Sequence, residues 1–197
     1  ERHARMRYQA VAFDFDGTLA EDGQVRPETM AALERLRATN RRLIVATGRE
    51  LPELLQLLPR PELFERIVAE NGGLLFDPAT GQEHPLAEPP PPDLVTMLRE
   101  RGVQPLSVGR VIIATWEPHQ ETVLDVIRTL GLGHRIIFNK GAVMVLPPDI
   151  SKGSGLAVAL RDLSLSPHNT VAIGDAENDY SMFDLVERSV AVMNALP

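Results

Sequence analysis

The sequence predicts an α/β fold, a Rossmann-like parallel sheet with helices on both faces, and a small inserted α+β unit. Its short apolar runs are rich in β-branched residues, which is typical of strands buried on both faces of a parallel sheet. A helical pattern with Pro27 near its start separates the first two runs, and strand-helix-strand is the crossover unit of such sheets. The expected strands span residues 8–14, 42–48, 66–70 and 170–175.

The helical spacing of apolar residues and the positions of the prolines predict the helices and the limits of the insert. The core helices are expected at 26–39, 151–163 and 179–187. The proline run 89–92 marks a change of character in the middle of the chain, because proline fixes φ and cannot donate a backbone hydrogen bond. We therefore expect a core domain made of residues 1–79 and 148–197, and an inserted α+β cap domain at 80–147. The insert is expected to contain helices 93–101 and 118–130 and strands 104–107, 110–115, 135–139 and 142–147.

The composition of the chain indicates which kinds of partner are unfavourable. The formal charge of -7 disfavours a nucleic acid or an anionic membrane, so the sequence predicts neither partner. No apolar run approaches the ~20 residues of a membrane span, and the chain has no cysteine. These features favour a cytoplasmic protein. A monomer or a homodimer is expected, and no feature of the sequence decides between them. The first residue is Glu1, so a place within a longer polypeptide stays open.

Two carboxylates close the first expected strand. Asp14 and Asp16 stand two residues apart, which places them on one side of an extended chain at the carboxyl edge, where open α/β sheets bind ligands. An Asp-Gly turn is the simpler interpretation of this stretch alone. A calcium loop does not fit, because Leu19 and Val25 occupy the positions that should be Gly and Glu.

Polar side chains follow the other elements of the same edge. Thr47 follows the second strand, Lys152 opens a helix, and Asp175 and Asp179 follow a later strand. Each alone could be a helix cap or a solvated side chain. In this order, at one edge of a parallel sheet, they indicate a single site.

The chain thereby resembles the haloacid dehalogenase-like hydrolases. Four motifs of that superfamily occur in order as "DFDGTL", "TGR", Lys152 and "GDAEND". The insert between the second and third motifs, with "AENGG" before it, is similar to the class II, Cof-like branch with an α+β cap. Members of this branch continue past the segment matching "VAVMNALP", so the C-terminal edge of this fold is expected to be missing, or the true end of the chain to lie elsewhere.

The resemblance implies phosphoryl transfer through an aspartyl-phosphate. Asp14 is the expected nucleophile, because a carboxylate in line with phosphorus can divide hydrolysis into two steps. Asp16 is the expected general acid and base for the leaving alkoxide and the attacking water. A halide leaving group needs no proton, so Asp16 favours phosphate esters over carbon-halogen substrates.

The acidic cluster also implies a divalent cation, since carboxylates repel a phosphate dianion unless a cation lies between them. Hard oxygen ligands and phosphate suit Mg²⁺. The expected ligands are the side chains of Asp14 and Asp175 and the backbone carbonyl of Asp16. Asp179 is expected beside the metal ligands or against Lys152.

The phosphoryl group needs donors. Thr47 and Lys152 are expected to hold its oxygens, with backbone N–H groups near Gly17 and Thr18. Gly48, Arg49 and Asn178 are further candidates for substrate binding, and Asn71 has a similar claim. Candidate substrate contacts from the insert are Arg110, Trp116, His119 and Lys140.

The leading function is therefore Mg²⁺-dependent hydrolysis of a small phosphomonoester, either a sugar phosphate or a phosphoglycolate-like acid. Two alternatives stay open. A phosphomutase would pass the phosphoryl group on to the same substrate, and a regulatory domain of a larger polypeptide would hold phosphate without turnover.

Overall fold

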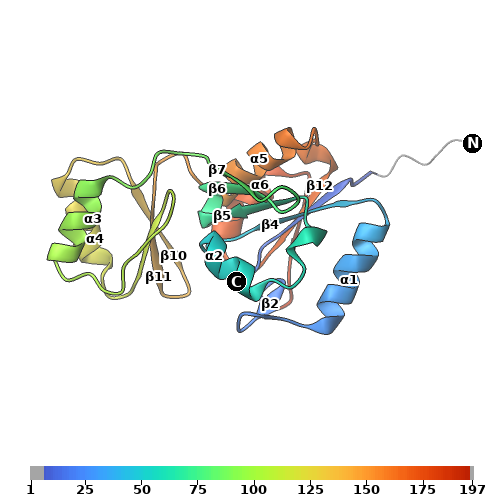
Figure 1. The fold of residues 1–197 in the computed structure, drawn as a ribbon, viewed down its shortest axis with the longest axis horizontal. Helices are drawn as coiled ribbons and strands as arrows, with labels where there is room; N and C mark the ends of the chain where they lie inside the picture. The colour runs from blue at the N-terminus through green and yellow to red at the C-terminus, as the bar shows by residue number, and fades with distance from the viewer. Residues whose placement is uncertain (1–6, 196–197) are drawn as a thin grey trace, which may run out of the picture.

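The structure is a computed structural model that describes residues 7–195, in which a large core and a smaller insert lie side by side (Figure 1). The core sheet has the strand order β13-β12-β1-β4-β5-β6-β7. The strands from β13 to β5 are parallel to one another. Strand β6 is antiparallel to β5, and β7 is antiparallel to β6. The strands of this sheet are β1 (Ala10–Phe13), β4 (Arg42–Ala46), β5 (Arg66–Ala69), β6 (Leu74–Asp77), β7 (Gln82–Pro85), β12 (Thr170–Gly174) and β13 (Arg188–Ala191).

Helices cover both faces of the core sheet (Figure 1). On one face lie α1 (Pro27–Ala38) and α2 (Leu51–Leu57), and on the other α5 (Lys152–Asp162) and α6 (Tyr180–Leu185). Short 3₁₀ turns connect these elements: η1 (Pro61–Leu63), η2 (Glu70–Gly72), η3 (Pro167–Asn169) and η4 (Glu177–Asp179). A small hairpin, β2 (Ala20–Glu21) and β3 (Gln24–Val25), follows β1.

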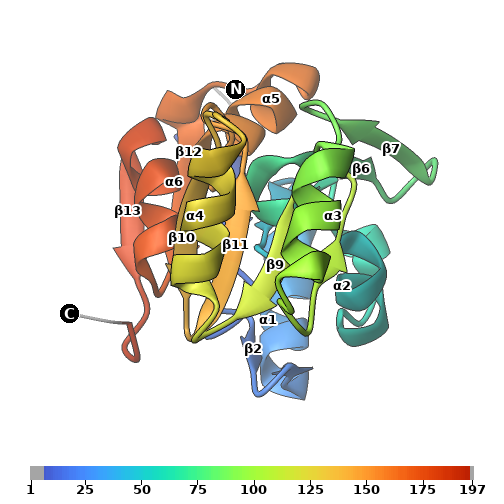
Figure 2. The same cartoon turned by 90° about the vertical axis from the view of Figure 1, so that its left-hand side faces the viewer.

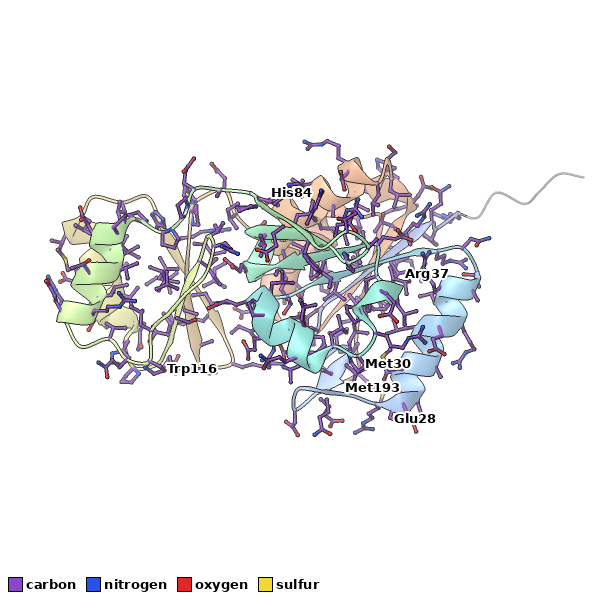
Figure 3. All side chains as sticks on the ribbon, viewed as in Figure 1. Glu28, Met30, Arg37, His84, Trp116 and Met193 are labelled. Atoms are coloured by element: carbon purple, nitrogen blue, oxygen red, sulfur yellow. The ribbon has the colours of Figure 1, made fainter. Side chains whose placement is uncertain are left out.

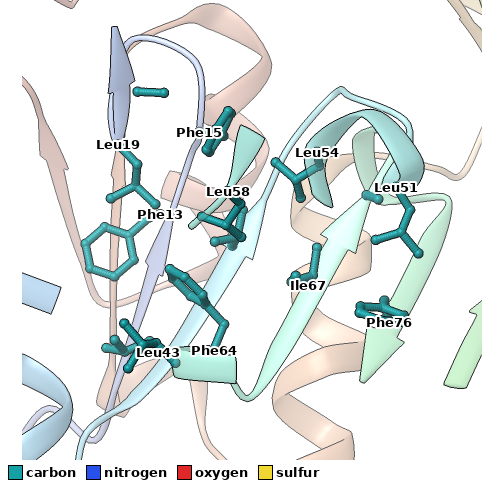
Figure 4. Close-up of a cluster of buried hydrophobic side chains, with 14 of the residues drawn as sticks. Phe13, Phe15, Leu19, Leu43, Leu51, Leu54, Leu58, Phe64, Ile67 and Phe76 are labelled. Atoms are coloured by element: carbon teal, nitrogen blue, oxygen red, sulfur yellow. The ribbon is translucent and has the colours of Figure 1, made fainter. Parts of the chain in front are cut away.

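Two apolar layers explain the continuous hydrophobic runs of the central strands. Phe13, Leu54 and Ile67 belong to the cluster on the α1 and α2 face, which Figure 4 shows in close-up. Ala12 and Leu156 belong to the cluster under α5 and α6. Because successive side chains of a strand point to opposite faces, a strand covered on both sides needs apolar residues at every position.

The insert is a four-stranded antiparallel sheet in the order β10-β11-β9-β8. Its two helices lie on the side away from the core, so the other face of the sheet is turned toward the core (Figures 1 and 2). Its elements are α3 (Pro92–Glu100), β8 (Ser107–Val108), β9 (Ile113–Trp116), α4 (Gln120–Thr129), β10 (Arg135–Asn139) and β11 (Ala142–Leu146).

The predicted fold class is confirmed, but one expected boundary differs. Residues 82–85 form β7 of the core sheet, so the expected start of the insert at residue 80 is too early. All four residues of β7 are exposed, and a polar edge strand lacks the apolar pattern of the central strands. Residues 1–6 and 196–197 of the expected core segments lie outside the described residues. Among residues 7–195, no helix has the length and apolar character to cross a membrane.

Candidate active site

The polar residues of the predicted site meet at the carboxyl edge of the core sheet. Asp14, Thr47 and Asp175 directly follow β1, β4 and β12, which are neighbouring parallel strands. All three residues are buried. Parallel strands end at a common edge, so residues far apart in the chain are placed together there.

A buried lysine joins two of the carboxylates. Lys152 Nζ donates to Asp14 Oδ1 at 2.5 Å and to Asp179 Oδ1 at 2.8 Å, and its side chain is 1% exposed. The other oxygen of Asp179 accepts from the backbone N–H groups of Asp175 and Ala176 at 2.9 and 3.2 Å. Both oxygens of Asp179 therefore have protein donors, and this residue positions Lys152 and the start of the loop after β12.

The first turn of α5 presents Lys152. Ser151 caps the helix, because its Oγ accepts from the Ser154 N–H at 3.0 Å while Ser154 Oγ accepts from the Ser151 N–H at 2.9 Å. Gly153 lets the helix approach its neighbour closely, since a Cβ there would lie 2.1 Å from the Ser181 carbonyl oxygen. A capped and closely packed helix start fixes the direction of the lysine side chain.

Burial and neighbouring charges shift the pKa values of Asp14 and Lys152. Burial raises the pKa of Asp14 to about 7, although Lys152 acts in the opposite direction. Burial by itself lowers the pKa of Lys152, but the carboxylates of Asp14 and Asp179 outweigh it and hold that pKa above its usual range. Lys152 thus stays protonated, whereas Asp14 needs a further cation to remain fully ionised at neutral pH.

The site fits a divalent metal ion. Asp14 Oδ2 is buried and has no hydrogen-bond partner, an arrangement that a ligand would correct. Carboxylate oxygens of Asp14, Asp175 and Asp179 lie within 4.8 Å of one another. An all-oxygen donor set of this kind suits a hard cation such as Mg²⁺.

Asp16 lies half-buried beside this cluster and is held by an arginine. Arg49 Nε donates to Asp16 Oδ2 at 2.7 Å and Arg49 Nη2 donates to Asp16 Oδ1 at 2.8 Å. Arg49 also pairs with Glu53. The sequence predicts that Arg49 contacts substrate, and in the structure its charge pairs with these two carboxylates.

The loop after Asp16 has a tight conformation. The N–H of Gly17 donates to the Ala20 carbonyl at 2.8 Å, and the N–H of Thr18 donates to the Phe15 carbonyl at 3.3 Å. A phosphoryl group could accept from these two amides only by replacing those bonds. Gly17 has φ +90°, and a Cβ at this position would lie 2.1 Å from Asp175 Oδ2.

A cavity of about 470 Å³ lies between this edge and the insert sheet. On the core side it is lined by Asp14, Asp16 and the loop that carries Gly48. On the insert side it is lined by Trp116 and Met144 among others. Trp116 is 53% exposed, and Figure 3 places it on the insert. The site is thus covered by a surface with an aromatic and an aliphatic part.

The insert candidates separate into two pairs. Trp116 and Lys140 line the cavity. Arg110 instead pairs with Glu83 of β7 at 3.1 Å, and His119 hydrogen-bonds the Gln104 carbonyl within the insert at 2.9 Å. Neither Arg110 nor His119 is among the cavity-lining residues, so their expected contact with substrate is not supported by their positions.

The loops near the second and fourth motifs also meet. Asn178 Nδ2 donates to Asn71 Oδ1 at 3.4 Å, and the Asn71 N–H donates to the Thr47 carbonyl at 2.8 Å. Thr47 Oγ1 accepts from the Arg49 N–H at 3.1 Å. These contacts tie the segments after β4, β5 and β12 together.

Sequence reasoning missed a buried carboxylate that joins core and insert. Glu70 is 1% exposed and accepts from the backbone N–H groups of residues 110, 111 and 112 at 2.9, 2.8 and 3.1 Å. Gly109 leaves room for it, because a Cβ there would lie 2.7 Å from the Glu70 carboxylate. The stretch "AENGG" marks this loop in the sequence, but nothing in its pattern indicates a partner some 40 residues further along the chain.

The fold and this edge of carboxylates and lysine define an α/β enzyme whose site lies under an inserted cap. The sequence profile of the haloacid dehalogenase-like hydrolases matches residues 11–108 and 109–197. The chain is 30% identical over 196 residues to the phosphoglycolate phosphatase of Haloarcula marismortui, covering 92% of this chain and 83% of that protein. It therefore belongs to the haloacid dehalogenase-like hydrolase family.

Solved structures agree with this assignment of the fold. A haloacid dehalogenase-like hydrolase from Bacteroides thetaiotaomicron superposes with a TM-score of 0.77 at 20% identity, over 96% of this chain and 90% of that one. The subclass IIB sugar phosphatase BT4131 superposes with a TM-score of 0.74 at 21% identity, over 95% and 88% of the two chains. The predicted family and the prediction of a phosphatase are confirmed, and the likeness to the subclass IIB structure is one of fold.

Proposed function

We propose that this phosphatase hydrolyses a small phosphomonoester with the help of Mg²⁺, by way of a phosphoryl group carried on Asp14. The observation that carries the proposal is the state of Asp14, a buried carboxylate with one oxygen on Lys152 and the other without a partner. A cation would offset the repulsion between this buried oxygen and the two neighbouring carboxylates, and the unpartnered oxygen is available to react with an electrophile.

Asp14 supplies the nucleophile. Lys152 donates to its Oδ1 and fixes the carboxylate, while its Oδ2 has no protein partner. Attack on phosphorus forms an Asp14–phosphate bond as the ester oxygen leaves. Thr47 and Lys152 bind the phosphoryl oxygens, and preorganised donors of this kind typically lower a barrier by ~3 to 4 kcal/mol each.

Asp16 moves the protons. It gives a proton to the leaving ester oxygen and then takes one from the water that attacks the Asp14 phosphate. Its two hydrogen bonds with Arg49 set the direction of the carboxyl group before substrate arrives. Arg49 thus acts through Asp16, as a positioning residue.

The residues suited to hold Mg²⁺ are Asp14, Asp175 and the backbone carbonyl of Asp16. When bound, this ion supplies the positive charge that lets a phosphate dianion approach carboxylates. Asp179 supports the metal site without binding the ion, since both of its oxygens accept from protein donors and hold Lys152 and the loop that carries Asp175.

The cavity supports a small substrate. About 470 Å³ lies within the range of small-molecule sites, and its insert side carries Trp116 and Met144 against the part of the substrate that is not phosphate. The named relatives are phosphatases of phosphoglycolate and of sugars, and we assign one of these two substrate classes to this chain.

Phosphate release tests the proposal. Release from phosphoglycolate and from a panel of hexose phosphates would be measured with Mg²⁺ and with EDTA. Asp14→Asn should abolish release in Mg²⁺. The matched control is Asp22→Asn, the same change at an exposed turn residue with φ 52°, a conformation that asparagine tolerates. Undiminished release by Asp14→Asn would refute Asp14 as the nucleophile.

A further inference from the structure

The chain contains only two lysines, and both contact the aspartates of the site. All other members of its 20 basic residues are arginines. Lys152 is the buried residue described above, and Lys140 lies in the turn between β10 and β11 of the insert. Only these two positions carry the compact ammonium group of lysine, whose shape and reach differ from those of the planar guanidinium found at every other basic residue.

The ammonium of Lys140 is bound by the oxygens that we assign to the metal ion. Lys140 Nζ donates to Asp175 Oδ2 at 2.8 Å and to the Asp16 carbonyl at 3.1 Å. The Asp175 side chain is 4% exposed, so this contact reaches into the core from the insert. The absence of a side chain at Gly17 makes room, because a Cβ there would lie 2.6 Å from Lys140 Nζ.

The backbone conformation of Lys140 is a second indication that this residue has a function. Asn139 pairs with Ala142, and the two turn residues Lys140 and Gly141 have φ 50° and 86°. A two-residue turn with positive φ at both positions favours asparagine or aspartate followed by glycine. Lysine is uncommon in this conformation, and an unusual residue at a strained position beside a site indicates function.

We propose that Lys140 occupies the metal subsite of the metal-free protein and that a divalent cation displaces it. This inference rests on the proposed metal site. Two cations cannot share the same pair of oxygens, so Mg²⁺ binding releases the turn of the insert from the core. The coupling is reciprocal: the factor by which bound Mg²⁺ weakens the contact of Lys140 with the core is also the factor by which that contact weakens Mg²⁺ binding.

The insert keeps other attachments to the core when Lys140 leaves. Glu70 holds the backbone N–H groups of residues 110, 111 and 112, and Ser107 donates to Glu50. Neither contact involves an oxygen assigned to the metal. Displacement of Lys140 therefore exposes its ammonium to solvent, while the insert stays docked through the loop around β8.

The small number of lysines makes the test direct. Protein labelled with ¹³C at lysine Cε gives two side-chain signals, and Lys140→Met assigns them by removing one. MgCl₂ would be titrated into the labelled protein without substrate. The Mg²⁺ affinities of wild type and Lys140→Met would be measured by calorimetry. Arg128→Met is the matched control, because it removes one exposed charge from α4, on the side of the insert away from the core.

Two results are expected together. The Lys140 signal moves to the position of a solvent-exposed lysine at saturating Mg²⁺. Lys140→Met binds Mg²⁺ about three- to fivefold tighter than wild type, the effect of one half-exposed charge pair, whereas Arg128→Met changes affinity less than about twofold.

Either missing result overturns the proposal. A Lys140 signal that Mg²⁺ leaves in place, or an unchanged affinity in Lys140→Met, would do so while leaving the proposed metal site intact. Absence of Mg²⁺ binding in both wild type and Lys140→Met would overturn the proposed metal site as well. Far-UV circular dichroism of each variant confirms that the fold is retained.

Discussion

Replacing Lys152 by methionine should make the stability of the protein strongly dependent on pH. The substitution removes an ammonium that donates to Asp14 at 2.5 Å and to Asp179 at 2.8 Å, and methionine fills similar space without charge. Lys152 is 1% exposed, so water cannot replace it as a partner. The two carboxylates remain buried without their cation.

The magnitude follows from burial. Removing one partner of a buried ion pair typically costs ~3 to 5 kcal/mol of unfolding free energy. Burial already raises the pKa of Asp14 to about 7 with Lys152 present, so loss of the lysine raises it further. A carboxyl group whose pKa is higher in the folded than in the unfolded protein stabilises the fold below its unfolded pKa, and this stability is lost as pH rises through the folded pKa. The variant should therefore suffer most at pH 8 and much less at pH 5.

Urea unfolding in EDTA, followed by circular dichroism at pH 5 and pH 8, measures this difference. The matched control is Lys140→Met, because Lys140 is 46% exposed and should contribute less than about 1 kcal/mol at either pH. A loss of less than about 1 kcal/mol for Lys152→Met at pH 8, or an equal loss at both pH values, would contradict this role of Lys152.

Three further predictions concern the site. With an Asp14 pKa of about 7, Mg²⁺ binding should release close to one proton at pH 6 and close to none at pH 8.5. Calorimetry in buffers of different ionisation enthalpy measures this, and equal release at both pH values contradicts it. Asp16→Asn should lower kcat on an alkyl phosphate by ~10² to 10⁴, and less on an aryl phosphate whose leaving group needs no proton. Equal losses on both substrates would exclude Asp16 as the acid. Gly17→Ala should weaken Mg²⁺ binding and lower the unfolding free energy by more than ~1 kcal/mol, because its Cβ would lie 2.1 Å from Asp175 Oδ2 at φ +90°. Wild-type Mg²⁺ affinity and an unchanged urea midpoint would contradict this expectation.

The core of the site could be predicted from the sequence because it depends on simple geometry. Asp14, Thr47 and Asp175 each directly follow an apolar strand, and adjacent parallel strands end at one edge. Lys152 opens a helix whose start is marked by Ser151. These positions follow from local pattern and the order of the strands.

Contacts that depend on docking of the insert could not be predicted. Lys140 meets Asp175 and Glu70 meets residues 110–112 only when the two parts pack together. The pattern around each residue is that of an ordinary turn or loop, and the partner lies some 35 to 42 positions away in the chain. Strand β7 was missed for a different reason, since an exposed edge strand carries no apolar signal.

A phosphoryl group carried on Asp14 during turnover can be trapped chemically. The measurement is an acid quench of the protein during steady-state hydrolysis, borohydride reduction of any acyl phosphate, and peptide mass spectrometry. We expect homoserine at position 14, formed only when substrate and Mg²⁺ are both present. Phosphate release without modification at position 14, or with the modification on another carboxylate, would contradict it.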